Sequence, residues 1–530
     1  MTRSTLEASK PVERSVADSI RPLLIGLDMG TTNVKAVSFT AAGEAIASAV
    51  ETTIVHSPRP GWAYYRPDEL WQQAAAVLRR VTETTRGRGT IEGVAIASMG
   101  ESGVLVDAQG DPLCDIIAWY DNRTVPQMEW LGATIGEERI AAVTGLSMQP
   151  IFTLNKLLWL QQHEPEAYQR ATRWLHVSDY IAFRLCRVPA TDFSLASRTM
   201  GFDLRARRWA DDLIRDAGLD DHLLPPAMQA GTRIGSVTSA AATETGLPLG
   251  AAVSTGGQDH VCGALAAGVT LKGRMLDSLG TAECLFICTD GPLDDPSIGK
   301  LGYTQGAHVV PGAWYVFAGV HSSGGSIEWL RGLLGRDIPL KTLLDEAAMI
   351  PPGSHGVMYL PHLLMGDPPY NDNRSRGALV GLSAGSGRGA ITRAVLEGLA
   401  YEARLSLQTL LPFAGLNRFP PITAIGGGSR NDLLLGIKAS VANTTFHALA
   451  VQEATALGAA MLAGIGAGVY IDVADALAQT TRDARVIEPC PDDIAFYDDL
   501  FTNVFAKLYA ATAPISHALY ERVIAPGDLA

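Results

Sequence analysis

The chain has 530 residues, 42 basic and 55 acidic side chains, a formal net charge of −13 and 47% hydrophobic residues. A chain of this length is expected to form two or three domains, and its apolar content excludes general disorder. The acidic balance argues against a general nucleic-acid-binding protein or a protein that binds anionic membranes, because both need a basic surface.

The first part of the chain reads as strands and helices that alternate. Residues 1–21 are polar without an apolar core, which predicts a disordered tail and no signal peptide. Residues 23–50 predict two or three strands separated by the turns MGTTN and AAGE. A helix is expected over residues 67–85, and strands over 91–98, 103–113 and 116–120. Such alternation is typical of a layered α/β domain.

The pattern restarts near residue 250. Residues 124–222 are expected to be mostly helical, and a short strand then runs into GGQDH. Residues 273–290 repeat the order of 21–40: a strand, an acid, a glycine–threonine turn and a second strand. We therefore predict two similar α/β domains over 22–250 and 251–485, with a hinge near residue 250 and a helical segment over 486–530.

Two features bear on the compartment. The run Ala454–Ile471 is uncharged over 18 residues, the lower limit for a membrane span, but its four glycines favour a buried helix followed by a loop. Among six scattered cysteines only Cys284 and Cys288 are close, and no histidine pair accompanies them. Reduced, mostly buried thiols in a cytoplasmic protein without a membrane anchor are expected.

Four turns share one design, in which a strand end is followed by small residues beside an acid or a hydroxyl. Glycine allows backbone N–H groups to approach a phosphate, threonine adds donors, and a carboxylate can hold Mg²⁺. Together these turns describe a nucleotide held between two domains. No GxxxxGK[ST] motif occurs, and no acidic ribose partner follows GGGSRN, so P-loop and Rossmann sites are disfavoured. The turns are Asp28–Thr32, Gly256–Asp259, Leu279–Thr281 and Gly426–Ser429.

Several motifs carry a resemblance to a known family. GLDMGTTNVKAV resembles the first phosphate loop of the actin, Hsp70 and sugar-kinase superfamily. The chain also resembles one branch, the FGGY carbohydrate kinases and their xylulokinase-like members, in TLNKLLWLQQHEPE, TDFSLASRTMGFDLRARRW, GGQDH, DSLGTAE, AVLEGLAYEAR, GGGSRND and EATALGAAMLAG. The matches span residues 23 to about 465. The resemblance implies two actin-like (ribonuclease H-like) α/β domains with an interdomain catalytic cleft, and an ATP- and Mg²⁺-dependent sugar kinase.

The resemblance assigns the nucleotide and catalytic residues. Asp259, at an expected helix start that would keep it ionised, is the predicted general base, and a helix-capping role is compatible with that. Asp28 is the predicted Mg²⁺ ligand, directly or through water. Gly324 and Gly325 form either a further nucleotide turn or an ordinary loop. The residues expected at the β- and γ-phosphates are Gly30, Thr31, Thr32, Gly280 and Thr281, and those expected at the adenosine are Gly427, Gly428 and Asn431.

The acceptor is expected to lie in the first domain, facing Asp259. The candidate residues are Met99 and Glu101 in SMGES, and Trp119, Asp121 and Arg123 in WYDNR. A carboxylate and a guanidinium supply the directed hydrogen bonds that a polyol needs, although a surface salt bridge is the alternative for Asp121 with Arg123. Trp119 is either a stacking platform or core.

The exact substrate is the least determined feature of the sequence. SMGES replaces the S-M-H-G of xylulokinase-like members, and an acid at Glu101 would repel a substrate carboxylate. We therefore expect a small neutral ketose or polyol, with a pentulose such as xylulose first and a tetritol or other polyol next. An Hsp70- or actin-like nucleotide-dependent binding protein is the alternative from another class, although the residues after 485 are too few for a peptide-binding tail. A homodimer is left open.

Overall fold

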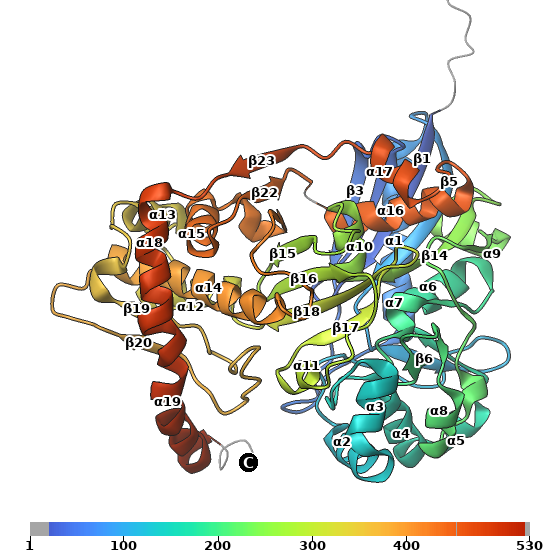
Figure 1. The fold of residues 1–530 in the computed structure, drawn as a ribbon. Coiled ribbons are helices and arrows are strands. Elements are labelled where there is room, and N and C mark those ends of the chain that lie inside the picture. The colour runs from blue at the N-terminus through green and yellow to red at the C-terminus, as the bar shows by residue number, and fades with distance from the viewer. Residues whose placement is uncertain (1–20, 452, 525–530) are drawn as a thin grey trace, which may run out of the picture.

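The structure is a computed structural model that describes residues 21–451 and 453–524. The predicted tail therefore lies outside the described residues, apart from Arg21. The first sheet occupies the right-hand side of Figure 1 and the second its centre. The first sheet has six strands in the order β13 (Arg233–Ser236), β14 (Ala252–Gln258), β5 (Thr90–Ser98), β1 (Pro22–Met29), β2 (Asn33–Thr40) and β3 (Ala45–Thr52).

The strands predicted within residues 23–50 are present as the antiparallel β1–β2–β3 meander. The predicted helix is α1 (Pro67–Thr85), which buries Leu70, Trp71 and Val77 against this sheet. The strand predicted over 116–120 is shorter, because β7 (Ile116–Ile117) ends where the N–H of Asp121 turns back to the carbonyl of Ala118.

The insertion between β7 and β13 is mostly helical, as predicted, and much of it packs around its own apolar cluster, whereas α6 (Val177–Cys186) packs against the first sheet. Its helices are α2 (Val125–Leu131), α3 (Glu137–Thr144), α4 (Thr153–His163), α5 (Pro165–Arg170), α6, α7 (Phe193–Ala196) and α8 (Asp211–Asp216). Short strand pairs accompany them: β4 (Tyr64–Tyr65) with β7, β6 (Gly103–Val106) with β8 (Arg173–His176), β9 (Thr191–Asp192) with β12 (Ala227–Met228), and β10 (Phe202–Asp203) with β11 (Arg208–Trp209). Helix α9 (Ser239–Thr245) follows β13.

The second sheet repeats the central design of the first. Its β15–β16 hairpin is antiparallel and β21 runs parallel to β15, as β5 runs parallel to β1. This relationship agrees with the duplication predicted from residues 273–290. The seven strands lie in the order β17 (Thr304–Ala307), β18 (Trp314–Val320), β16 (Glu283–Thr289), β15 (Met275–Leu279), β21 (Ile422–Ile425), β22 (Phe446–Leu449) and β23 (Ala484–Ile487).

Several helices of this half group around α14 (Arg388–Leu410), which packs against β16, β18 and a neighbouring strand pair. The α-helices between β16 and β22 are α11 (Ser297–Lys300), α12 (Gly324–Leu334), α13 (Leu340–Ala348), α14 and α15 (Asp432–Ala442), and the strand pair is β19 (Met358–Leu360) with β20 (Ala378–Val380). One large cluster, with Tyr359, Leu399 and Phe446 among its members, forms the core.

The change from the first sheet to the second comes later than residue 250. Strand β14 pairs in parallel with β5, and α10 (Asp259–Ala266) follows it directly, so these residues extend the first sheet, although the sequence pattern placed them in the second domain. Backbone pairing with β5 decides this, and no local pattern reports it. We therefore propose the domain boundary between α10 and β15.

The uncharged run forms α16 (Ala454–Ala467), a buried helix that lies against the first sheet although it comes late in the chain (Figure 1). The approach is close, because a Cβ at Gly26 would lie only 1.7 Å from the carbonyl oxygen of Ala456. In the part of the chain that the structure describes, no helix is long and apolar enough to cross a membrane. All six cysteines are described; none is paired and four are buried.

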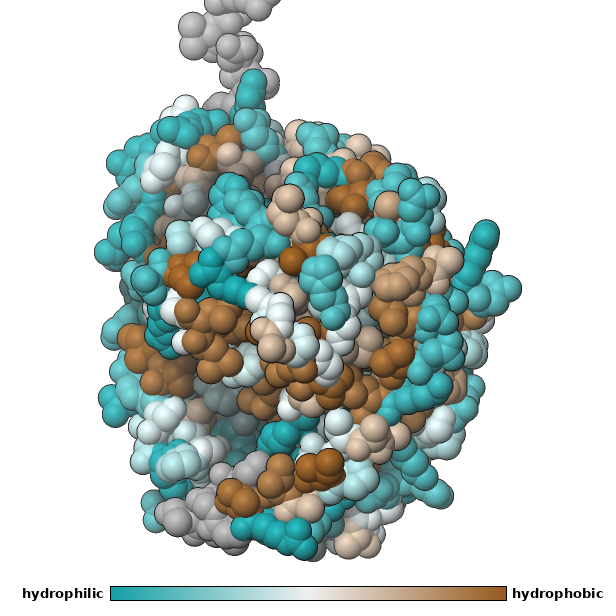
Figure 2. Space-filling model, turned by 90° about the vertical axis from the view of Figure 1, so that its left-hand side faces the viewer, coloured by the Kyte–Doolittle hydropathy of each residue, from teal (hydrophilic) through white to brown (hydrophobic). Residues whose placement is uncertain are grey.

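The chain ends in helices, as predicted. After α17 (Val473–Gln479) and β23 come α18 (Pro491–Leu500), a π-helical turn (Phe501–Phe505) and α19 (Ala506–Leu519). Figure 2 looks onto the side where these helices lie and shows brown apolar groups among hydrophilic ones. Ile515, Leu519 and Val523 are all more than half exposed. The homodimer stays a prediction.

Candidate active site

Three parallel strands of the first sheet end at one edge and carry the predicted residues there. Met29 of β1 is in register with Ser98 of β5, which is in register with Gln258 of β14. Asp28, the SMGES segment and Asp259 therefore meet around the same strand ends. For Met99 and Glu101 this geometry agrees with the expectation that the acceptor residues lie near Asp259, whereas for Trp119, Asp121 and Arg123 the expectation stays a prediction.

Asp259 is the first residue of α10. Its Oδ1 accepts the N–H of His260 at 2.7 Å, and its side chain is 24% exposed. The residue therefore satisfies one of the unpaired N–H groups of the first helical turn while its carboxylate still reaches solvent. The geometry is compatible with both predicted roles, the cap and the base.

Asp28 is held in an unfavourable electrostatic environment. Its Oδ1 is buried and accepts no hydrogen bond from the described residues. Burial, and then the negative charge of Asp259, raise the pKa of Asp28 to about 8, while Lys35 acts in the opposite direction. Lys35 itself binds Glu453 at 2.6 Å. A buried carboxylate oxygen without a partner, beside a second carboxylate, fits the ligand chemistry of Mg²⁺.

The first glycine turn is fixed on both sides. The N–H of Gly30 donates to the carbonyl of Asn33, and the hydroxyl of Thr53 donates to the carbonyl of Gly30 at 2.8 Å. The indole Nε1 of Trp119 donates to Oγ1 of Thr31 at 2.9 Å, whereas Thr32 is exposed. Trp119 is thus tied by its edge to the predicted phosphate turn.

The turn Leu279–Thr281 rests on the start of α12. The N–H groups of Gly324 and Gly325 donate to the carbonyls of Gly280 and Thr281, at 3.2 and 2.9 Å. These two N–H groups therefore hold the turn and are not directed to a nucleotide. Both Gly280 and Thr281 are exposed at the sheet edge.

The turn Gly426–Ser429 packs directly on the turn Leu279–Thr281. A Cβ at Gly426 would lie 2.6 Å from the carbonyl oxygen of Leu279, and one at Gly428 would lie 2.8 Å from its Cβ. Gly427 is exposed, and the side-chain oxygen of Asn431 caps α15 by accepting the N–H of Leu434. The predicted adenosine residues thus adjoin the predicted phosphate turn.

A buried ion cluster that the sequence did not indicate lies beside the turn Leu279–Thr281, and its two acids are on the strands that flank this turn. Nζ of Lys438 is 2.7 Å from Oδ2 of Asp277 and 2.6 Å from Oε1 of Glu283, and all three side chains are 1% exposed. The hydroxyl of Ser323 donates to the other oxygen of Glu283. Burial, and then Glu283, raise the pKa of Asp277 to about 7. Lys438 is far from both acids in sequence, so no local motif could have revealed the cluster.

On the acceptor side, Glu101 forms a buried ion pair with Arg198, which sequence reasoning missed. Oε1 of Glu101 accepts Nε of Arg198 at 2.6 Å, and both residues are under 5% exposed. Glu101 has a φ of 61°, which is rare for a residue other than glycine. Met99 is buried beside it in sequence. Arg198 lies inside the TDFSLASRTMGF block, which was the only signal that could have pointed to it.

Asp121 and Arg123 form a buried pair, and the surface salt bridge considered above is not what the structure shows. The carboxylate of Asp121 accepts four hydrogen bonds, three from Arg123 and one from the N–H of Ala63. These bonds fill the acceptor capacity of a carboxylate, so Asp121 positions Arg123 and has no free site for a sugar. The guanidinium carbon lies 3.9 Å from the ring centre of Trp62 and 5.0 Å from that of Trp159.

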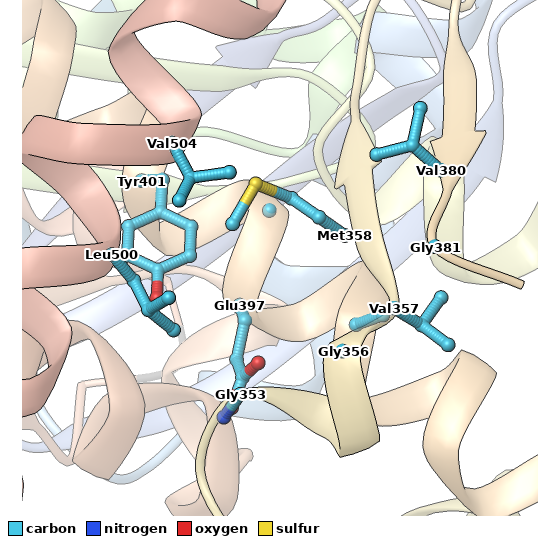
Figure 3. A pocket seen from close by; sticks show the side chains of 12 residues that line it. Gly353, Gly356, Val357, Met358, Val380, Gly381, Glu397, Tyr401, Leu500 and Val504 are labelled. Carbon is cyan, nitrogen blue, oxygen red and sulfur yellow. The ribbon is translucent and has the colours of Figure 1, made fainter.

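A separate cavity of about 380 Å³ lies between β19–β20, α14 and the π-helical turn. Figure 3 shows Met358, Val504 and the ring of Tyr401 turned towards one another there. None of its lining residues belongs to the predicted site.

Comparisons with known proteins agree on one family. The sequence model of the FGGY family of carbohydrate kinases, N-terminal domain, matches residues 23–266, and that of the C-terminal domain matches residues 275–467. The xylulose kinase of Bacillus subtilis is 28% identical over 497 residues, which are 94% of this chain and 98% of that protein. The L-fuculokinase of Escherichia coli K12 is 30% identical over 477 residues, 88% of this chain and 97% of that protein. The crystal structure of xylulose kinase from Rhodospirillum rubrum superimposes with a TM-score of 0.84 at 30% identity, covering 93% of this chain and 100% of that one.

Proposed function

Because the chain belongs to the FGGY family of carbohydrate kinases, we propose that it transfers the γ-phosphate of ATP to a primary hydroxyl group of a neutral ketose or polyol. Membership of this family confirms the predicted sugar kinase and its two-domain α/β fold. It also sets aside the alternative of an Hsp70- or actin-like binding protein.

The observation that supports the proposal most directly is that Asp28 and Asp259 lie at the ends of β1 and β14, the two strands that flank β5. Asp259 is partly exposed on the first turn of α10 and accepts the proton of the attacking hydroxyl group. Asp28 is the proposed Mg²⁺ ligand, because its Oδ1 is buried and unpartnered. When bound, Mg²⁺ supplies positive charge to the phosphate oxygens.

The glycine turns are the proposed phosphate and adenosine sites. Gly30, Thr31 and Thr32 approach the phosphates from the first domain, and Gly280 and Thr281 from the second. Gly427, Gly428 and Asn431 hold the adenosine side. Phosphoryl transfer depends on positioning, so turns that are themselves held by hydrogen bonds suit this role.

The substrate is proposed to be a pentulose, with xylulose first. Relatives named xylulose kinase and L-fuculokinase match nearly the whole chain, which supports a sugar but does not separate one from another. Oε2 of Glu101 accepts no hydrogen bond from the described residues, and a substrate carboxylate has no hydrogen to donate to it, which disfavours an acidic sugar. A tetritol or other polyol is the second candidate, since the same polar groups serve any neutral chain of hydroxyl groups.

An acceptor panel tests the proposal. ADP release is measured with ketoses, polyols and gluconate, and without any sugar, for the wild type and for Asp259→Asn. We expect release only with neutral acceptors, fastest with a pentulose, and almost none in the variant. Faster turnover with gluconate than with every neutral compound would overturn the acceptor class. Equal ADP release with and without sugar would overturn the kinase proposal.

A further inference from the structure

The pair of Glu101 and Arg198 offers one unused donor and one unused acceptor. Oε1 of Glu101 lies 2.6 Å from Nε and 2.5 Å from Nη2 of Arg198. Nη1 of Arg198 is buried and has no hydrogen-bond partner among the described residues, and Oε2 of Glu101 accepts no hydrogen bond from them. Buried donors are nearly always paired, so this one calls for a partner outside the described chain.

The backbone around the pair is also unusual. The left-handed φ of Glu101 carries a conformational cost, and such residues gather at ligand sites. At Gly100 an added Cβ would already be 3.5 Å from Cγ of Arg198 and 3.6 Å from Cγ of Gln258. A longer side chain there would push the arginine away. Glycine at position 100 therefore leaves room for Arg198.

The pair lies next to the proposed base. Gln258, which like Arg198 adjoins Gly100, directly precedes Asp259. The guanidinium carbon of Arg198 is 5.2 Å from the ring centre of Phe317, on β18 of the second sheet. The free donor and acceptor thus lie by the paired ends of β5 and β14, beside the segment that carries the proposed base.

We infer that Glu101 and Arg198 together recognise one hydroxyl group of the acceptor, and that Arg198 is a specificity-determining residue. A hydroxyl group both accepts and donates, so it takes Nη1–H of Arg198 on its oxygen and gives its hydrogen to Oε2 of Glu101. A substrate carboxylate offers acceptors only, so it leaves Oε2 of Glu101 without a donor. A deoxy compound leaves both protein groups unpaired. The inference rests on the proposed function and gives it a specificity: neutral acceptors that carry a hydroxyl at one defined carbon.

The test combines changes in the protein with changes in the substrate. Single-deoxy analogues of the best acceptor are compared by kcat/KM in the wild type, Arg198→Met, Arg198→Lys and Glu101→Gln. We expect one analogue to lose about tenfold or more in the wild type, because a site built for a hydroxyl group rejects its absence. In Arg198→Met the penalty for that analogue should fall to about twofold, while the penalties at other positions stay unchanged.

The matched control is Arg205→Met, which removes an exposed arginine paired with Asp294. It should leave the ratio of kcat/KM between the parent sugar and each analogue as in the wild type. Equal losses for the parent sugar and all analogues in Arg198→Met would show a structural role and overturn the inference. If Arg198→Met does not fold, Arg198→Lys and Glu101→Gln apply the same criterion, with KM for ATP as the check on the fold.

Failure of the proposed function is distinguishable from failure of the inference. If the wild type releases no ADP with any sugar, the kinase proposal fails, and calorimetric binding of the same analogues to wild type and Arg198→Met still tests the pair. The inference about the pair is overturned if the ratio of the dissociation constants of analogue and parent sugar is the same in Arg198→Met as in the wild type. It is also overturned if no polyhydroxylated compound binds to the wild type.

Discussion

The indole N–H of Trp119 donates a 2.9 Å hydrogen bond to the hydroxyl oxygen of Thr31, which joins the proposed acceptor site to the proposed phosphate turn. Trp119 belongs to the WYDNR segment, and Thr31 to the turn after β1. The bond gives a physical route by which acceptor binding can affect the position of the turn.

Replacing Trp119 by Phe keeps an aromatic ring and removes the donor. A neutral hydrogen bond contributes about 0.5–1.5 kcal/mol, so we expect kcat/KM for both substrates to fall by roughly 2–10-fold. A double-mutant cycle with Thr31→Val should show that the two changes are not additive. Trp209→Phe, which breaks an indole bond to the carbonyl of Pro225, is the control and should leave kinetics unchanged. Strict additivity would mean that the bond does not couple the two sites.

Asp259→Asn should lower kcat by at least ~10²-fold while ATP still binds. Asparagine can still accept the N–H of His260, so the helix start is preserved, but it cannot take the proton. Steady-state kinetics and nucleotide binding by calorimetry measure the two effects. Asp211→Asn changes the first residue of α8 in the same way and should have no effect. Near-normal turnover of Asp259→Asn would mean that Asp259 only caps the N-terminus of α10 and is not the general base.

Asp28→Ala and Thr31→Ala should impair the use of ATP and Mg²⁺ more than the binding of the acceptor. Asp28→Ala should not lower Tm in the absence of Mg²⁺, because burial and the nearby charge of Asp259 disfavour the ionised form of Asp28 and raise its pKa. A Mg²⁺ titration of activity and a thermal unfolding curve check these outcomes. An unchanged Mg²⁺ dependence in Asp28→Ala would refute its role as a ligand.

Lys438→Met should destabilise the protein by about 3–5 kcal/mol, because it leaves Asp277 and Glu283 buried without their cation. Asp277 and Glu283 are on β15 and β16, which carry the turn Leu279–Thr281 between them, so KM for ATP should rise as well. Chemical denaturation measures the free energy of unfolding. Lys341→Met is the control: its ion pair with Asp345 is exposed, and its loss should cost less than about 1 kcal/mol. Similar small losses in both variants would contradict the prediction.

His308 should make the protein less stable as pH falls. Its Nε2 donates to the carbonyl of Val269 and its Nδ1 accepts the N–H of Val310, so the buried ring is neutral. Burial lowers its pKa to about 3, against roughly 6.5 in the unfolded chain. Between these values the unfolded state binds more protons, so His308 removes about 1.4 kcal/mol of stability per pH unit below 6.5.

The free energy of unfolding of His308→Gln, measured from pH 7 to pH 5, should therefore fall by about 2 kcal/mol less than that of the wild type. His222→Gln, at an exposed ring, should keep the wild-type slope. If the free energy of unfolding depends equally on pH in the wild type and in His308→Gln, the folded protein binds a proton at His308 as readily as the unfolded chain does, and the prediction is wrong.

Local sequence determined the elements and most of the candidate site. Strand alternation between residues 23 and 50 and the apolar spacing of residues 67–85 are properties of neighbouring residues, so β1, β2, β3 and α1 could be predicted. The glycine turns were visible for the same reason, since a strand end, a glycine and a hydroxyl lie within a few residues. The structure places Gly426 and Gly428 against Leu279, and Asp28 and Asp259 at one end of the first sheet, while the meeting of all the turns around one nucleotide and the roles of the residues stay predictions.

Tertiary structure decided what depends on residues far apart in the chain. Strand β14 joined the first sheet because it pairs with β5, and α16 crossed back to that sheet because Gly26 lets it approach. Glu101 pairs with Arg198, and Asp277 and Glu283 both pair with Lys438. Only the fold brings these charges together. Burial then sets how strongly they interact, since removal from water raises both the cost of an unpaired charge and the strength of a pair. Sequence spacing carries no information about either quantity.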